Sequence, residues 1–249
     1  MIKRLTPLLL LLLFFGAAPL LAQTGGFPVI NFSLEESTRP QQLNTTIQIV
    51  LLMTVLALAP SILVMTTAFT RIVVIFHFLR QAIGTQNTPS NQILISLALF
   101  LTYFVMGPVF TEINDNALQP YLNEEIEQQE AFQLATEPVK RFMLIHTRDK
   151  ELALFADYFQ GEIPTSRSEL SLAVVIPAFM ISELRVAFQI GFMLYLPMLL
   201  IDMVVSAVLM SMGMMMLPPV MISMPFKILL FVLVDGWYLI VESIINGLR

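Results

Sequence analysis

The 249-residue sequence contains no cysteine, one tryptophan and only two histidines. The absence of cysteine excludes disulfide bonds, thiolate metal sites and cysteine nucleophiles. His77 and His146 belong to no catalytic or metal-binding motif, and the sequence has no phosphate loop, zinc signature or serine elbow. We therefore expect neither an enzyme nor a bound cofactor.

Charged residues are also scarce. They make up 12% of the chain, whereas 57% of the residues are hydrophobic and the mean hydropathy is +0.79. These values exclude an ordinary soluble globular protein and are typical of integral membrane proteins. The net charge of −5 and the small number of arginines also disfavour binding to nucleic acid.

The first 22 residues have the features of a secretory signal peptide. Two basic residues precede the apolar run Leu8–Phe15, and small residues lead to a cleavage position after Ala22. The alternative is an uncleaved transmembrane helix, but the run is short and Pro19 follows it. We expect residues 1–22 to be removed, which implies a bacterial envelope protein.

Residues 46–110 predict a first helical hairpin. The stretch Ile47–Phe78 is nearly all apolar, residues 80–92 form a polar turn, and Ile93–Phe110 is apolar again. A single span needs only about 20 residues. The first helix is therefore expected to overshoot the bilayer or to bend at Pro60.

The charge pattern predicts the direction of this hairpin. No acidic residue lies between Glu36 and Glu112, whereas Arg71 and Arg80 flank the polar turn. The positive-inside rule places the turn in the cytoplasm. Residues 23–45, which are polar, are then an N-terminal segment in the periplasm.

Residues 111–170 differ from the rest of the chain because they carry twelve acidic and five basic side chains. The stretches Glu124–Phe132 and Val139–Phe159 have scattered apolar residues suited to amphipathic helices. We expect a small, acidic helical domain in the periplasm.

Residues 171–249 predict a second helical hairpin. The apolar stretch Leu170–Met210 contains Pro177 and Pro197, and as one helix its 41 residues would be about 60 Å long. That is about twice the hydrocarbon thickness, so two spans, one bent helix and an incomplete hairpin remain open. With a last span at Ile228–Ile245, the fold class is an all-α membrane protein of long, proline-broken hairpins.

Seven of the sixteen methionines fall in the short segment that joins the apolar stretches of the second hairpin. They are Met210, Met212, Met214, Met215, Met216, Met221 and Met224. Gly213, Pro218 and Pro219 lie among them, so the backbone there cannot remain helical throughout. A non-helical element at membrane depth is best explained if it faces a cavity or another subunit.

Methionine is unbranched and polarizable, so it packs against surfaces of variable shape. A copper(I) site is one alternative, but no histidine or cysteine is nearby. Core packing is another, and it would account for one or two methionines rather than seven. The segment therefore predicts the lining of a pore or gate.

Several ionisable residues lie at membrane depth, where they usually face a partner, a cavity or water. Glu183 and Arg185 point about 200° apart on a helix, whereas Arg185 and Gln189 share a face. Each could find a partner within its own chain. The alternative, which we favour, pairs Glu183 of one copy with Arg185 of the next.

Asp202, Lys227 and Asp235 are further ionisable residues at membrane depth. Two intramembrane aspartates could form a protease dyad that shares one proton. Asp235, however, lies in Leu-Val-Asp-Gly-Trp, which is not the pattern of such proteases. We therefore treat these residues as polar contacts.

Seven segments carry a resemblance to a known family. They are Phe179–Phe192, Gly213–Pro219, Pro225–Lys227, Leu233–Trp237, Thr70–Val74, Arg80–Gly84 and Pro89–Gln92. The chain resembles the FliP family of flagellar export-gate proteins, which also includes injectisome counterparts. The resemblance runs in order from about residue 45 to the end of the chain, and the signal peptide and periplasmic domain favour the flagellar branch.

The resemblance implies a core subunit of the type III export gate in the inner membrane of the flagellar basal body. Several copies would assemble with FliQ and FliR into a helical, conical channel that passes unfolded flagellar subunits. Its hairpins would be raised toward the periplasm, and Met212, Met214, Met215 and Met216 would form a gasket. FlhB and other export-apparatus proteins are further expected partners. An injectisome homologue and a copper or ion transporter remain alternatives.

Overall fold

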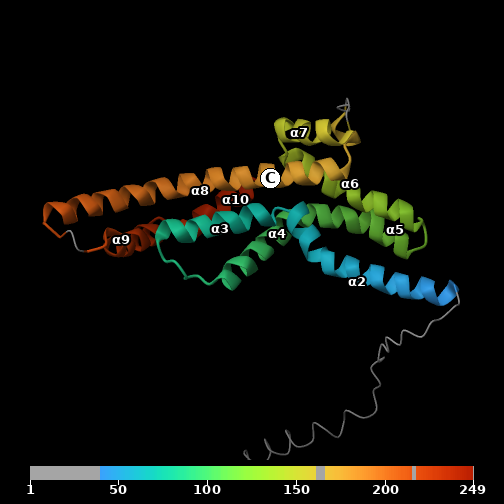
Figure 1. The fold of residues 1–249 in the computed structure, drawn as a ribbon, viewed down its shortest axis with the longest axis horizontal. Coiled ribbons are helices and arrows are strands. Elements are labelled where there is room, and N and C mark those ends of the chain that lie inside the picture. Colours follow the sequence, from blue (N-terminus) through green and yellow to red (C-terminus); the bar gives the residue numbers. More distant parts are fainter. Residues whose placement is uncertain (1–39, 161–165, 215–216, 249) are drawn as a thin grey trace, which may run out of the picture. The chain divides into compact units, whose positions relative to one another are not determined.

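The computed structural model describes residues 40–160, 166–214 and 217–248, and every regular element in these ranges is a helix. In chain order they are α2 (Pro40–Thr66), α3 (Phe69–Ile83), α4 (Asn91–Ile113), the π-helix η1 (Asn114–Leu118), α5 (Gln119–Leu122), α6 (Gln128–His146), α7 (Asp149–Gln160), the 3₁₀-helix η2 (Arg167–Glu169), α8 (Leu172–Ser211), α9 (Pro219–Leu233) and α10 (Gly236–Asn246). Figure 1 shows their course. The predicted signal peptide lies outside the described residues.

The chain divides into two units, Met1–Thr54 and Val55–Arg249. The structure describes the first unit only from Pro40, where it forms the beginning of α2. The second unit contains the end of α2 and all the other helices, and the remaining description concerns this unit.

The first predicted helix is divided, but not at Pro60. Helix α2 continues through Pro60 and ends at Thr66, and α3 starts at Phe69. Thr66 and Thr67 donate from Oγ1 to the carbonyls of Ile62 and Leu63, at 2.8 and 2.6 Å. Both are bonds to the carbonyl four residues earlier, within the helical ladder. Across the break, the carbonyl of Val64 in the last turn of α2 accepts from Thr70 Oγ1 of α3 at 2.8 Å.

Helix α3 supplies the centre of the hydrophobic core. Its residues Ile72, Ile75 and Phe76 are fully buried, and α3 packs along α8 over its length and against α4. Gly84 ends α3 in the left-handed region at φ 86°, with its N–H directed to the carbonyls of Arg80 and Gln81. This glycine cap begins the polar turn that leads to α4.

The predicted acidic domain does not begin at a break in the chain. Helix α4 continues through η1 into α5, so the chain is helical from Asn91 to Leu122. The two amphipathic helices that follow are α6 and α7, and both pack on α8. They divide at Thr147, whose backbone is extended, and Pro138 lies within α6.

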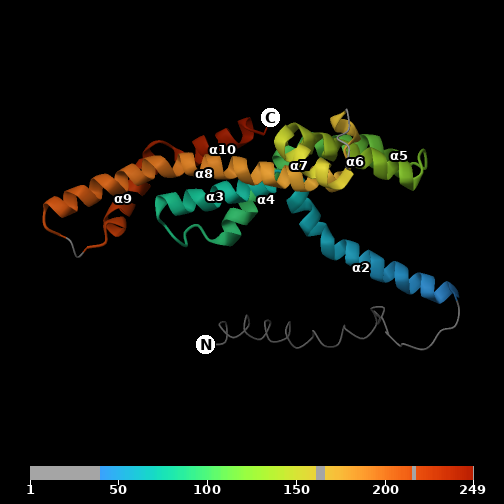
Figure 2. The same cartoon turned by 45° about the horizontal axis from the view of Figure 1, so that its top comes forward.

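The overlong stretch of the second hairpin is a single helix. Helix α8 has 40 residues, includes Pro177 and Pro197, and is about 60 Å long. Figure 2 shows it as one continuous rod, with α9 returning beside its final turns. Of the three alternatives that hydropathy left open, the two-span form is excluded, because the helix contains no turn. How far the hairpin crosses the membrane stays a prediction.

The last predicted span is broken. Helix α9 ends at Leu233, and α10 starts at Gly236 with a bend of 63°. Asp235 occupies the left-handed region at φ 52°, where a helix cannot continue. By length and composition, the described helices provide three candidate membrane spans, or four if α9 and α10 act as one.

Candidate functional site

The methionine segment forms the turn between α8 and α9. Helix α8 ends in a Schellman motif, in which Gly213 donates its N–H to Met210 O and Met214 donates to Leu209 O, both at 3.0 Å. Gly213 has φ 75°, a conformation that glycine adopts without steric cost. The glycine therefore turns the chain sharply out of α8.

Two prolines begin the returning helix. Pro218 is the residue before α9, with an extended backbone, and Pro219 is its first residue. A proline at the first helical position loses no hydrogen bond, because that N–H has no partner within a helix. The turn is thus bounded by residues that end one helix and start the next.

The methionines that the structure describes in this turn are exposed. Met212 and Met214 are 68% and 40% exposed, and Met210 and Met221 on the adjoining helices are also exposed. Met215 and Met216 lie outside the described residues. An apolar cluster at the end of a hairpin is costly to leave in water and suits contact with another surface.

A buried polar cluster joins the two arms of this hairpin. Lys227 Nζ of α9 lies 2.6 Å from Asp202 Oδ2 of α8, and Ser223 Oγ donates to Asp202 Oδ1 at 2.5 Å. Ser223 and Lys227 are four residues apart and share one face of α9. Both are buried. The cluster therefore fixes the register of α9 against α8, and with it the position of the turn.

The two aspartates considered as a protease dyad have separate surroundings. Asp202 is bonded by Lys227 and Ser223, whereas Asp235 is exposed at the bend between α9 and α10. No hydrogen bond joins the two carboxylates among the described residues. The geometry gives no support to a shared proton.

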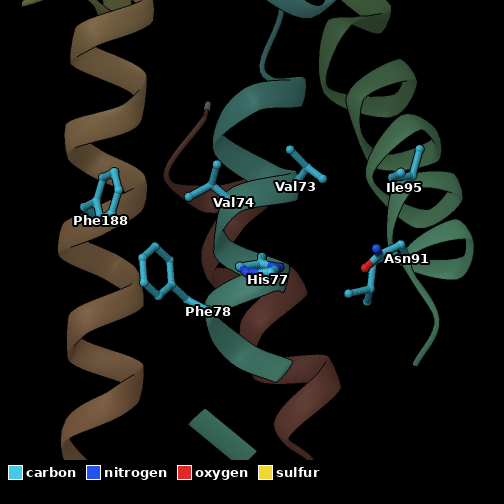
Figure 3. Close-up of a pocket in the computed structure, with 8 residues that line it drawn as sticks. Val73, Val74, His77, Phe78, Asn91, Ile95 and Phe188 are labelled. Carbon is cyan, nitrogen blue, oxygen red and sulfur yellow. The ribbon is translucent and has the colours of Figure 1, made fainter. Parts of the chain in front are cut away.

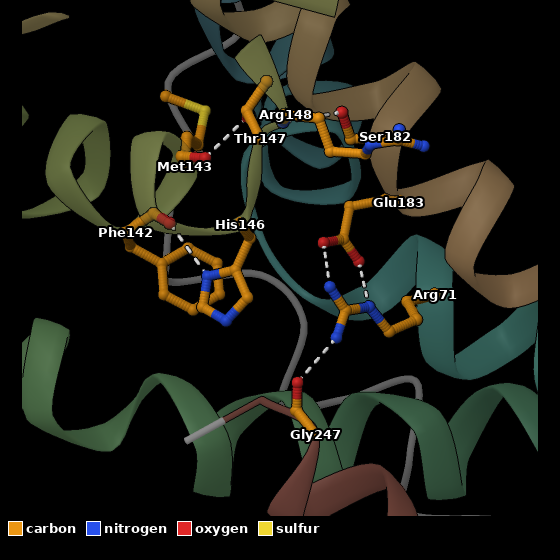
Figure 4. A network of polar contacts seen from close by, with 9 residues as sticks. All are labelled: Arg71, Phe142, Met143, His146, Thr147, Arg148, Ser182, Glu183 and Gly247. Carbon is orange, nitrogen blue, oxygen red and sulfur yellow. Dashed lines mark hydrogen bonds and ion pairs between the residues drawn. The ribbon is translucent and has the colours of Figure 1, made fainter. Parts of the chain in front are cut away.

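A second buried ion pair fastens α3 to α8 (Figure 4). Arg71 donates from Nε and Nη2 to the two carboxylate oxygens of Glu183, at 2.6 and 2.5 Å, and from Nη1 to Gly247 O at 3.0 Å. The Glu183 side chain is fully buried. This bidentate arrangement gives each carboxylate oxygen a charge-assisted hydrogen bond, and it also holds Gly247, which follows α10.

The expected pairing between copies is therefore not what the structure shows. Glu183 has an internal partner, Arg71, because the face of α8 opposite Arg185 packs on α3. Arg185 is exposed and lies 3.6 Å from Glu151 of α7. Gln189 is exposed as well. Of the three residues predicted to make contacts between copies, only Arg185 and Gln189 have exposed side chains.

Sequence reasoning assigned no polar contact to Arg71 or to Ser223. It used Arg71 as a mark of the cytoplasmic side and as part of the segment Thr70–Val74. Arg71 is 112 residues from Glu183. The signal that could have found the pair is a lone buried acid and a lone base on two apolar helices, since each requires a counter-ion.

The fold and these contacts define a class: an all-helical membrane protein whose long hairpins carry buried ion pairs and an exposed methionine turn. The family model described as the FliP family matches residues 52–244, and the chain belongs to that family. It is similar to the flagellar biosynthetic protein FliP of Bacillus subtilis, with 56% identity over 211 residues that cover 85% of this chain and 96% of the relative.

Two other relatives carry the same description. FliP of Caulobacter vibrioides is 54% identical over 203 residues, which cover 82% of this chain and 76% of the relative. FliP of Aquifex aeolicus is 50% identical over 206 residues, which cover 81% and 85%. The chain is thus a membrane-embedded component of the flagellar export apparatus, with a structural role in a channel, and is not an enzyme.

Proposed function

We propose that this chain is a core subunit of the flagellar export gate in the bacterial inner membrane. Several copies assemble with FliQ and FliR into a channel for unfolded flagellar subunits, and FlhB and other export proteins dock on it. The acidic residues 111–170 and the segment 23–45 lie on the periplasmic side. Family membership and the extent of exposed apolar surface on α4, α8 and α9 support this assembly.

The methionine turn closes the channel in this proposal. Met212, Met214, Met215 and Met216 of each copy meet around one axis and block ions while export is idle. The observation that carries the proposal is the exposure of Met212 and Met214 on a turn whose position is fixed by the buried Asp202–Lys227 pair. Flexible thioether side chains can repack around a passing polypeptide, which rigid branched side chains cannot.

The test is a measurement of ion leak. Replacing Met212, Met214, Met215 and Met216 with alanine shortens the side chains that fill the pore, so membranes or vesicles containing the assembled gate are expected to leak ions. A matched control replaces Met193 and Met203, two exposed methionines of α8 away from the turn. We expect the control to stay ion-tight. An ion-tight gate after replacement of the turn methionines would refute the gasket.

A further inference from the structure

Arg80, at the end of α3, is a buried cation surrounded by neutral groups. Its side chain donates from Nη1 to Pro89 O at 3.1 Å and to Asn91 Oδ1 at 2.7 Å, and its Nη2 lies 3.2 Å from His77 Nδ1. A guanidinium has only donors, so His77 Nδ1 is the acceptor in this contact. The residue is only 8% exposed, and its Nε is buried without a hydrogen-bond partner.

No carboxylate lies within ion-pair distance of Arg80 in residues 40–160, 166–214 and 217–248. The two other buried cations of this part of the chain behave differently, because Arg71 pairs with Glu183 and Lys227 with Asp202. A buried charge without a counter-ion is costly. The structure therefore calls for an anion at Arg80 that comes from another molecule.

A groove beside Arg80 indicates what kind of molecule carries this anion. The groove has a volume of about 470 Å³ and lies between α3, α4 and α8. Its apolar lining consists of Val73, Val74, Phe78, Leu94, Ile95 and Phe188. Figure 3 shows the two remaining lining residues, His77 and Asn91, on facing helices. These two residues also hydrogen-bond Arg80, which does not itself line the groove. The polar part of the groove therefore lies next to the cationic cluster of Arg80, His77 and Asn91.

We propose that this groove binds one anionic phospholipid. The phosphate lies against the cluster of Arg80, His77 and Asn91, and an acyl chain runs along Ile95 and Phe188. A guanidinium matches the geometry of a phosphate, and basic pockets between transmembrane helices bind anionic head groups. The apolar walls favour a lipid over an acidic peptide, and α4 and α8 are both candidate membrane spans. The site is independent of the gasket.

The first test compares head groups. The full chain, with the copies and partners that it assembles with, is purified in mild detergent and titrated with phosphatidylglycerol or phosphatidylcholine of identical acyl chains, and retained lipid is counted by native mass spectrometry. We expect phosphatidylglycerol to be preferred. Arg80→Gln is expected to weaken its binding about tenfold or more. Arg141→Gln, at an exposed arginine, serves as the control and leaves binding unchanged.

A second variant leaves the Arg80 cluster in place, because Arg80→Gln also removes hydrogen bonds to the turn. Ile95→Trp fills the groove, and Leu99→Trp adds the same bulk one turn later on α4, outside the lining. We expect Ile95→Trp to lose phosphatidylglycerol at least tenfold and Leu99→Trp to retain it. Equal retention of both lipids, or retention unchanged by Arg80→Gln and Ile95→Trp, overturns the proposal. An acidic side chain of another copy or of a partner found on Arg80 also overturns it.

Discussion

Lys227 of α9 and Asp202 of α8 form an ion pair of 2.6 Å in which the lysine side chain is almost completely buried. Asp202 lies ten residues before Met212 on the α8 arm of the second hairpin. It joins the arms on the side that also carries Ser223, so a shift of α9 along α8 would break two contacts to one carboxylate. The position of the methionine turn thus depends on a buried polar contact between two apolar helices.

Replacement of Lys227 by methionine is expected to destabilise the protein by about 3 kcal/mol, because it leaves the partly buried Asp202 charge without its cation. The thermal unfolding midpoint in detergent should fall by about 6 °C or more. The double replacement Lys227→Met with Asp202→Asn removes both charges and is expected to recover much of the loss. A double variant no more stable than Lys227→Met alone would show that the unpaired Asp202 charge is not the cause of the loss.

Two substitutions distinguish the pairing of Glu183 with Arg71 of its own chain from a pairing with Arg185 of another copy. Glu183→Gln leaves the Arg71 charge buried without its counter-ion, so we expect a loss of about 3–5 kcal/mol in stability. Arg185→Glu alters an exposed side chain and should change stability by less than about 1 kcal/mol. Both are measured as shifts of the unfolding midpoint in detergent. A large loss from Arg185→Glu and none from Glu183→Gln would reverse the assignment of the partner.

Gly191 sets the distance between α3 and α8. A Cβ at this position would lie 2.6 Å from the ring of Phe78, and that ring packs on Phe188 with a centroid distance of 5.1 Å. Gly191→Ala is therefore expected to cost about 1–3 kcal/mol through overpacking. Gly107→Ala is the matched control, since no atom lies within 4 Å of its added Cβ. Thermal unfolding of the two variants should separate them, and equal midpoints would exclude a close approach at Gly191.

Gly213 shapes the methionine turn through its left-handed backbone. At φ 75°, an alanine is strained by about 1–2 kcal/mol, whereas asparagine tolerates this region better. We expect Gly213→Ala to raise ion leak by displacing the turn, with Gly213→Asn showing a smaller effect. Leak that is the same for both variants and the unchanged protein would mean that the turn keeps its course without glycine.

The sequence predicted the parts of the fold that depend on local chemistry. Apolar runs predicted the helices, and Gly213 with Pro218 predicted where the second hairpin turns, because these residues act on their own backbone. Helix breaks that depend on context were misplaced. Pro60 lies inside α2, which continues to Thr66, and Asp235 divides a stretch that hydropathy treats as one span.

The partners of the buried charges could not be predicted in the same way. Hydropathy indicated that Glu183 and Asp202 require cations, but it carries no information on which distant residue supplies one. Arg71 and Lys227 reach these carboxylates through the packing of α3 and α9 on α8. This packing depends on how the side chains of these helices fit together. At Gly191, for example, the absence of a side chain leaves room for the ring of Phe78, and hydropathy does not predict such a fit.

The central claim is that the methionine turns of neighbouring copies meet around one axis, and the absence of cysteine allows a clean test. A cysteine is introduced at Met214 in one preparation and at Met193, an exposed position on α8, in a control. The assembled gate is then exposed to a mild oxidant and separated by non-reducing electrophoresis. The account predicts disulfide-linked pairs of copies for Met214→Cys and none for Met193→Cys. An intact assembly in which Met214→Cys stays monomeric while Met193→Cys forms pairs would contradict it.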